Sequence, residues 1–145
     1  MFKKIAVAFD ESPEAQRAFR SALDLAKLAG ASVVLITVVE KLPAYVSYVS
    51  AVAPEVPHLL KTERQVFYRD MQSRAKEVAE RAGVLIDSTL VEGDEVEALV
   101  QAVQQLRPDL LVVGLRRDPG GIGSILGGTA HRLALHADCD VLGIR

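Results

Sequence analysis

The sequence is poor in the residues that hold small or unusual folds together. It contains no tryptophan, one cysteine and only 5% aromatic residues over 145 positions. A lone cysteine, Cys139, cannot form an internal disulfide, which excludes a disulfide-stapled scaffold. Six prolines in a chain that is 50% hydrophobic exclude a disordered or collagen-like chain. The composition is that of an ordinary globule, large enough to bury roughly two thirds of the surface that its unfolded chain exposes.

Long hydrophobic runs are missing as well. No uninterrupted apolar stretch approaches the ~20 residues that cross a bilayer. The start of the chain, Met1-Phe-Lys-Lys, leads into a short apolar segment that meets an acid at Asp10, unlike a secretory signal peptide. We therefore expect a cytoplasmic protein with no membrane-inserted segment.

The charges are balanced and scattered. Seventeen Lys and Arg stand against nineteen Asp and Glu, a formal net charge of −2. No basic stripe is present that could follow a phosphate backbone, so we do not expect a nucleic-acid partner.

The hydrophobic period switches repeatedly between that of a strand and that of a helix. The pattern predicts strands at 5–9, 32–39, 84–91, 110–113 and 141–144, and helices at 13–29, 58–82, 96–106 and 126–137. Ser12 and Pro13 predict the start of the first helix, and Gly30 predicts its end. Strands that alternate with helices form parallel sheets with helices on both faces. We predict one domain, residues 1–145, of the α/β class, with a doubly wound, Rossmann-like sheet of five parallel strands.

Residues 41–57 interrupt this alternation. The segment holds Pro43, Pro54 and Pro57 and shows no sustained period. Loops longer than ~12–15 residues in a compact domain are usually functional lids or disordered. We predict a mobile lid over the ligand pocket, without a regular element.

Asp10 directly follows the first predicted strand. Ligands of doubly wound sheets bind beyond the carboxyl ends of the strands. The carboxylate either accepts hydrogen bonds from a ligand or caps the following helix. Its position alone leaves both interpretations open.

The segment 114–129 runs from a predicted strand end to a predicted helix start and has six glycines in 16 residues. Glycines let a backbone approach an anion, and a helix N-terminus favours negative charge, so the segment is a candidate phosphate cradle. The alternative is a flexible connecting loop. It is not a P-loop, because no Gly-Lys-Ser/Thr occurs. The three histidines have no spacing that predicts a metal site.

Segments distributed along the whole chain resemble one known protein family. The segments Ile5-Ala-Val-Ala-Phe-Asp10, Leu35-Ile-Thr-Val-Val-Glu40 and Val91-Glu-Gly-Asp94, and the run from Pro108 to the C-terminus, resemble the universal stress protein superfamily. Nucleotide-binding members carry the motif G-x2-G-x9-G-[S/T]. Gly114 and Gly127 match its first and last glycines. Arg117 stands in place of the second glycine and Gly128 in place of the hydroxyl residue.

The resemblance implies a site for ATP accompanied by Mg²⁺. Asp10 would bind the adenosine end, and the backbone of Val38 would contact adenine. The ribose and phosphates would lie against Gly114, Gly127, Gly128 and Thr129. Arg117 departs from the motif, but a guanidinium can bind phosphate, so we expect it to help hold the phosphates. Because of the two departures from the motif, we expect weak binding of ATP.

Three functions remain open at this stage. The first is a regulatory homodimer that binds ATP and acts on an unknown protein partner. The second is a slow ATP hydrolase or phosphotransferase, in which Asp10 or Asp118 positions water and Arg116 or Arg117 stabilises phosphoryl charge. The third is a structural dimer without a ligand. In each case we expect dimerisation through the edge of the last strand, residues 141–144, because unpaired strand edges are either covered or paired.

Overall fold

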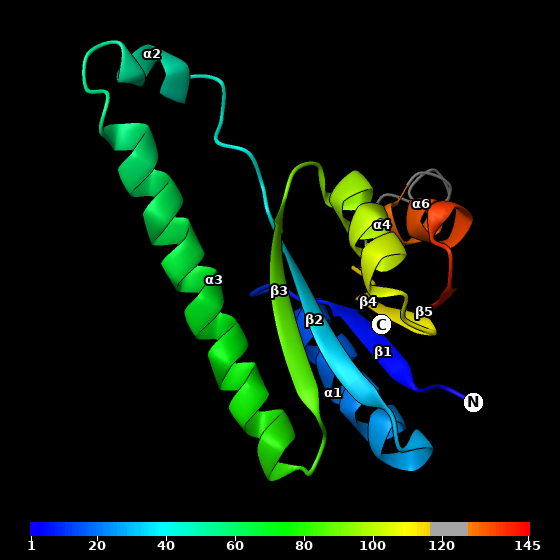
Figure 1. The fold of residues 1–145 in the computed structure, drawn as a ribbon. Coiled ribbons are helices and arrows are strands. Elements are labelled where there is room, and N and C mark those ends of the chain that lie inside the picture. The colour runs from blue at the N-terminus through cyan, green and yellow to red at the C-terminus, as the bar shows by residue number, and fades with distance from the viewer. Residues whose placement is uncertain (117–127) are drawn as a thin grey trace.

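The computed structural model describes residues 1–116 and 128–145, and it contains one sheet of five parallel strands (Figure 1). The strands are β1 (Lys4–Ala8), β2 (Ser32–Val39), β3 (Ile86–Glu92), β4 (Leu110–Gly114) and β5 (Asp140–Ile144). Their order across the sheet is β3-β2-β1-β4-β5. The predicted α/β fold with a doubly wound parallel sheet is confirmed. The strand order reverses between β1 and β4, which is where such sheets bind ligands.

Helices cover both faces of the sheet. Helices α1 (Pro13–Ala29) and α3 (Val56–Arg81) pack on one face, and α4 (Glu95–Leu106) and α6 (Thr129–His136) pack on the other. Strand residues alternate between the two cores, because successive side chains of a strand point to opposite faces. Ile5, Val7, Val33 and Leu35 contribute to the α1/α3 core, whereas Ala6, Val34 and Ile36 contribute to the α4/α6 core.

Helix α1 begins and ends where the sequence predicts. The hydroxyl of Ser12 accepts a hydrogen bond from the Ala15 N–H at 3.1 Å, and Pro13 occupies the first turn. Gly30 ends the helix in the left-handed conformation at φ 65°, which glycine adopts without steric cost. Both signals are local, so the sequence alone is sufficient to place this helix.

The prediction that residues 41–57 lack a regular element is wrong. The short helix α2 (Val46–Ser50) lies within them, beyond the carboxyl edge of the sheet and near the first turns of α3 (Figure 1). Pro43 precedes this helix and Pro54 follows it, so neither proline interrupts it. Pro57, the third proline, lies in the first turn of α3, where its missing N–H is not needed.

The apolar period of the sequence places six residues on one face of α3, Leu60, Phe67, Met71, Ala75, Val78 and Ala82, and only part of that face is buried. Ala75 is buried, and Met71 and Ala82 pack against the core, whereas Leu60, Phe67 and Val78 are 37%, 53% and 51% exposed. The buried residues of α3 are Gln72, Ala75 and Ala79, and all three lie in its second half. Toward its N-terminus α3 diverges from the sheet (Figure 1), so the large apolar residues there are left partly exposed. The apolar period was correctly found, but its largest residues do not mark the buried side.

Gly114, the last residue of β4, lies against the first turn of α1. A β-carbon at this position would stand 2.5 Å from the carbonyl oxygen of Glu14, a backbone atom that cannot move aside without shifting α1. Gly143 of β5 is also crowded, but there the nearest atom, at 2.8 Å, belongs to the flexible side chain of Leu115. The absence of a side chain at Gly114 therefore allows α1 to pack directly on the end of β4.

This contrast predicts unequal effects of the same substitution. Gly114→Ala should lower the free energy of unfolding by about 1–3 kcal/mol, the usual range for overpacking. Gly143→Ala should have a smaller effect, because the Leu115 side chain can change rotamer. Urea unfolding followed by circular dichroism measures both. An equal loss in the two variants would contradict the role assigned to the Glu14 backbone.

Candidate functional site

The carboxyl ends of β1, β2 and β4 bring together the residues that the sequence singled out. Asp10 follows β1, Val38 lies near the end of β2, and Gly114 ends β4. Strands β2 and β4 are the two neighbours of β1. The chain leaves β1 toward α1 on one face of the sheet, and α6, which follows β4, lies on the other face. This is the arrangement that opens a crevice at the end of a doubly wound sheet.

Asp10 caps the chain segment that enters α1. Its Oδ1 accepts a hydrogen bond from the Ser12 N–H at 2.8 Å. Within residues 1–116 and 128–145, its other carboxylate oxygen has no hydrogen-bond partner. The two interpretations left open by the sequence are therefore compatible, because one oxygen holds the turn and the second is available to a ligand.

The backbone of Val38 faces the gap beside Asp10. Even-numbered residues of β2 bond to β1, as shown by Ser32 N–H donating to Lys3 O and Phe9 N–H donating to Ile36 O, both at 2.9 Å. The next rung of this parallel ladder would run from Val38 N–H to Phe9 O. Among the described residues this bond is absent. Val38 thus presents an amide donor and a carbonyl acceptor toward the end of β1.

A buried polar pair lies directly beneath these residues, and the sequence analysis did not find it. Thr37 and Gln72 are the buried polar residues of the described ranges, 0% and 4% exposed. Gln72 Nε2 donates to Thr37 Oγ1 at 2.8 Å and to Thr89 O at 2.9 Å, and Thr37 Oγ1 donates to Phe9 O at 2.7 Å. A signal was present in the sequence: Gln72 lies three and seven residues before Ala75 and Ala79, on the same face of α3.

Acidic side chains surround the site on the side of β2 and α4. A hollow of about 370 Å³ between the ends of β2 and β3 is lined by Glu40, Lys41, Gly93, Asp94 and Glu95. Desolvation, with the negative charges of Asp10, Glu40 and Asp94, raises the pKa of Glu95, and Arg116 partly opposes this effect. The site therefore has a negative potential on this side.

Tyr68 brings a phenol from α3 to the same region. Partial burial raises its pKa, and the carboxylates of Glu11, Asp10 and Glu40 raise it further. The hydroxyl therefore keeps its proton at neutral pH and is a hydrogen-bond donor. Two neighbouring contacts hold α3 against the strand ends: Lys61 Nζ pairs with Glu92 at 3.0 Å, and Arg64 donates to the Glu40 carbonyl at 3.1 Å.

The remaining predicted site residues belong to the segment between β4 and α6. Gly128 is the N-cap of α6 and has extended dihedrals of φ −69° and ψ 157°, and Thr129 is the first residue of the helix. Glycine cannot supply the side-chain cap that a serine or threonine would give. Arg117 and Gly127, like Asp118 of the hydrolase alternative, lie outside the described residues. The mobility and lid role predicted for residues 41–57 stay predictions.

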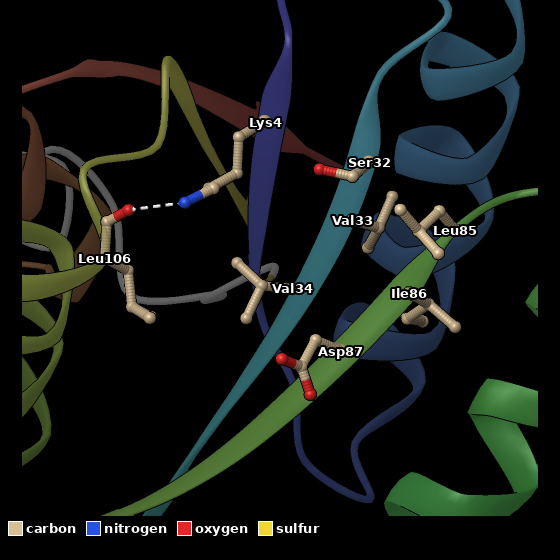
Figure 2. Close-up of a pocket in the computed structure, with 8 residues that line it drawn as sticks. All are labelled: Lys4, Ser32, Val33, Val34, Leu85, Ile86, Asp87 and Leu106. Atoms are coloured by element: carbon tan, nitrogen blue, oxygen red, sulfur yellow. Dashed lines mark hydrogen bonds between the residues drawn. The ribbon is translucent and has the colours of Figure 1, made fainter.

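A second hollow, of about 330 Å³, lies at the opposite edge of the sheet (Figure 2). It is lined by the first residues of β1, β2 and β3 and by the end of α4, where Lys4 Nζ donates to the Leu106 carbonyl at 2.9 Å. Because it lies at the amino ends of the strands, it is separate from the candidate site. Metal ligands are not gathered at either edge: within the described ranges, no three His, Cys, Asp or Glu residues are placed to hold an ion.

The fold and the site define a doubly wound α/β protein with a candidate ligand crevice at the switch point of its sheet. The chain belongs to the universal stress protein family, whose model matches residues 1–145. A universal stress protein of Thermus aquaticus is 32% identical over 146 residues, and the match covers 100% of both chains. The crystal structure of a family member from Burkholderia pseudomallei is 30% identical, with a TM-score of 0.75 over 99% of this chain and 96% of that one.

Two further solved structures share the fold and contain nucleotides. A universal stress protein in complex with cAMP is 24% identical, with a TM-score of 0.70 over 99% of this chain and 97% of that chain. A family protein from Arabidopsis thaliana with AMP bound is 21% identical, with a TM-score of 0.70 over 98% and 90%. Within the described ranges, no helix combines the length and the apolar character that a membrane span requires.

The raised pKa of Glu95 predicts how stability depends on pH. The folded state holds this proton more tightly than the unfolded state, so ionisation of Glu95 destabilises the fold as pH rises above about 4.3. Glu95→Gln removes this penalty. The variant should melt at a higher temperature than the wild type at pH 7, and the difference should disappear below about pH 4.

Glu97→Gln is the matched control, because it makes the same carboxylate-to-amide change two residues further along the same helix. This control should change the melting temperature at pH 7 much less than Glu95→Gln does. Thermal melts at several pH values measure all three proteins. A Glu95→Gln variant that is less stable than the wild type at pH 7 would show that the ionised carboxylate is favourable there.

Proposed function

We propose that this chain is a cytoplasmic regulatory protein that binds an adenine nucleotide at the carboxyl ends of β1, β2 and β4 and acts as a homodimer. The observation that carries the proposal is the open end of the β1–β2 ladder. There the Val38 backbone and one carboxylate oxygen of Asp10 have no hydrogen-bond partners among the described residues. The relatives that contain AMP and cAMP support an adenine ligand.

In this proposal the base lies against Val38 and Asp10. The phosphates extend toward Gly114 and the N-terminus of α6 at Gly128 and Thr129, where backbone N–H groups favour negative charge. Gly127 takes the role that the family motif implies for its last glycine. Arg117, which replaces the second glycine of the motif, would bind phosphate through its guanidinium. The protein partner on which the dimer would act is not identified by its chemistry.

The acidic surroundings limit the charge of the ligand. Glu40, Asp94 and Glu95 repel a triphosphate more strongly than a monophosphate. When ATP binds, Mg²⁺ would neutralise part of this charge. It would be held through phosphate oxygens and water, with at most one or two carboxylates, since no three metal-ligating side chains are gathered in the described ranges. We therefore propose that AMP binds at least as tightly as ATP without Mg²⁺.

Calorimetry with AMP, ATP and adenosine tests this function. Asp10→Ala should weaken AMP binding by about tenfold or more, because a hydrogen bond to a charged group is lost. Asp10→Asn is the sharper variant, because its amide oxygen can still accept from Ser12 N–H while the charge is removed. If the wild type binds none of these ligands at millimolar concentration, the ligand-free structural dimer replaces this proposal. Steady phosphate release from ATP that Asp10→Ala abolishes would favour the hydrolase.

The proposed dimer forms through the free edge of β5. Within the described residues this strand pairs with β4 alone, and Leu115 N–H donates to Ile144 O at 2.6 Å. Even-numbered residues of β5 therefore bond to β4, while the backbone groups of Val141 and Gly143 face outward. The apolar side chain of Leu142 is 38% exposed on the same edge strand.

Val141→Pro removes an outward N–H without touching the β4–β5 ladder, so it should convert the dimer to a folded monomer. Val141→Ala is the control, because it shortens the same side chain but keeps the N–H. Light scattering at tens of micromolar, with circular dichroism to check folding, measures the outcome. A monomeric wild type, or a Val141→Pro variant that stays dimeric, would refute an interface at this edge.

A further inference from the structure

The buried pair of Thr37 and Gln72 occupies the place where the β1–β2 ladder stops. The ladder is regular up to the Phe9 N–H, which donates to Ile36 O at 2.9 Å. Regular pairing would then continue with Val38 N–H donating to Phe9 O, and Glu11 N–H donating to Val38 O. Neither bond is present among the described residues. The Phe9 carbonyl instead accepts from the hydroxyl of Thr37 at 2.7 Å.

Gln72 fixes the direction of that hydroxyl. Its amide nitrogen donates to Thr37 Oγ1 at 2.8 Å and to the Thr89 carbonyl at 2.9 Å, so both amide protons are used. A carbonyl oxygen can only accept, which requires the NH₂ end of Gln72 to lie at this position. Since Thr37 Oγ1 accepts from Gln72, its single proton is left for Phe9 O. Two of these bonds thus form a directed chain from α3 through β2 to the end of β1, and the third ties Gln72 to β3.

We propose that Thr37 and Gln72 are positioning residues that end the β1–β2 ladder one rung early, and so keep the Val38 backbone open to a ligand. Their ligand-binding role rests on the proposed function, whereas their effect on the ladder does not. Both side chains are buried, so the chain they form cannot exchange its partners for water. Apolar side chains of the same size would pack α3 on the sheet equally well, so packing alone does not account for a polar pair at this position.

The exposed backbone pair selects the base. Val38 offers an N–H donor and a C=O acceptor side by side, and Asp10, which follows β1, has one carboxylate oxygen without a hydrogen-bond partner among the described residues. Adenine presents an amino donor beside a ring-nitrogen acceptor, which complements this pair. Guanine held in the orientation of adenine presents a carbonyl acceptor in place of the amino group and would leave the Val38 carbonyl unpaired. A site built in this way discriminates between the bases through its unpaired polar groups.

Thr37→Val tests the proposal, because valine has the shape of threonine without the hydroxyl. The Phe9 carbonyl then lacks its partner, and Val38 N–H is the nearest backbone group that can close the rung. Hydrogen exchange of the Val38 amide, measured by NMR without any ligand, should slow by about tenfold or more.

In the same Thr37→Val variant, AMP affinity should fall by about tenfold, and the preference for AMP over GMP should fall with it. Gln72→Met should shift both readouts in the same direction by a smaller factor, because the Thr37 hydroxyl remains.

Two variants separate positioning from general destabilisation. Thr37→Ser keeps the hydroxyl and should restore both Val38 exchange and AMP affinity to within about twofold of the wild type. Thr89→Val makes the same hydroxyl-to-methyl change on the neighbouring strand and should leave both readouts near wild type. In a folded Thr37→Val, unchanged Val38 exchange would overturn the proposal. A Thr37→Ser variant as impaired as Thr37→Val would also overturn it. If the wild type binds no nucleotide, the proposed function fails while Val38 exchange still tests the ladder.

Discussion

The hydrogen bond between the Thr37 hydroxyl and the Phe9 carbonyl is the contact on which the candidate site depends. A parallel ladder continues as long as both strands remain extended and in register, and β2 runs on to Val39 beside β3. β1 ends at Ala8. The carbonyl of the next residue, Phe9, therefore needs a side-chain donor if the Val38 N–H is not to pair with it. The same bond satisfies a buried acceptor and separates two backbone segments. Asp10 and Val38 acquire their positions from this separation.

The features that the sequence predicted correctly are those with local causes. Ser12, Pro13 and Gly30 define α1 through hydrogen bonds and dihedral angles within a few residues. The order of strands and helices followed from changes of period, because a strand and a helix bury their faces at different spacings. The sequence predicted only in part which side chains of α3 are buried, because that depends on the surface against which the helix packs. Leu60 and Phe67 have the size of core residues, yet they lie in the N-terminal part of α3, which diverges from the sheet. Ala75 and Ala79, further along the helix, are buried instead.

The electrostatics of the site explain why its ligand cannot be inferred from the glycine-rich segment alone. Glycines and a helix N-terminus favour anions, but Glu40, Asp94 and Glu95 lie at the same edge of the sheet and oppose them. The balance depends on how far the phosphates extend from the base. A short nucleotide can keep its charge near Thr129 and Arg116, whereas a longer one requires a cation. In the proposed binding mode, residues that belong to no nucleotide motif would therefore decide how many phosphates the ligand carries.

The proposed recognition of the ligand by the Val38 backbone would be invisible to motif-based sequence analysis. Every residue has an N–H and a C=O, so a ligand contact made by these groups leaves no trace in the identity of the residue that makes it. The information lies instead in the side chains that free those groups from regular pairing, here a threonine one position earlier in β2 and a glutamine 35 residues further along the chain. Neither side chain has to touch the ligand. A buried polar side chain in an otherwise apolar strand is therefore a stronger pointer to such a site than the residues that line it.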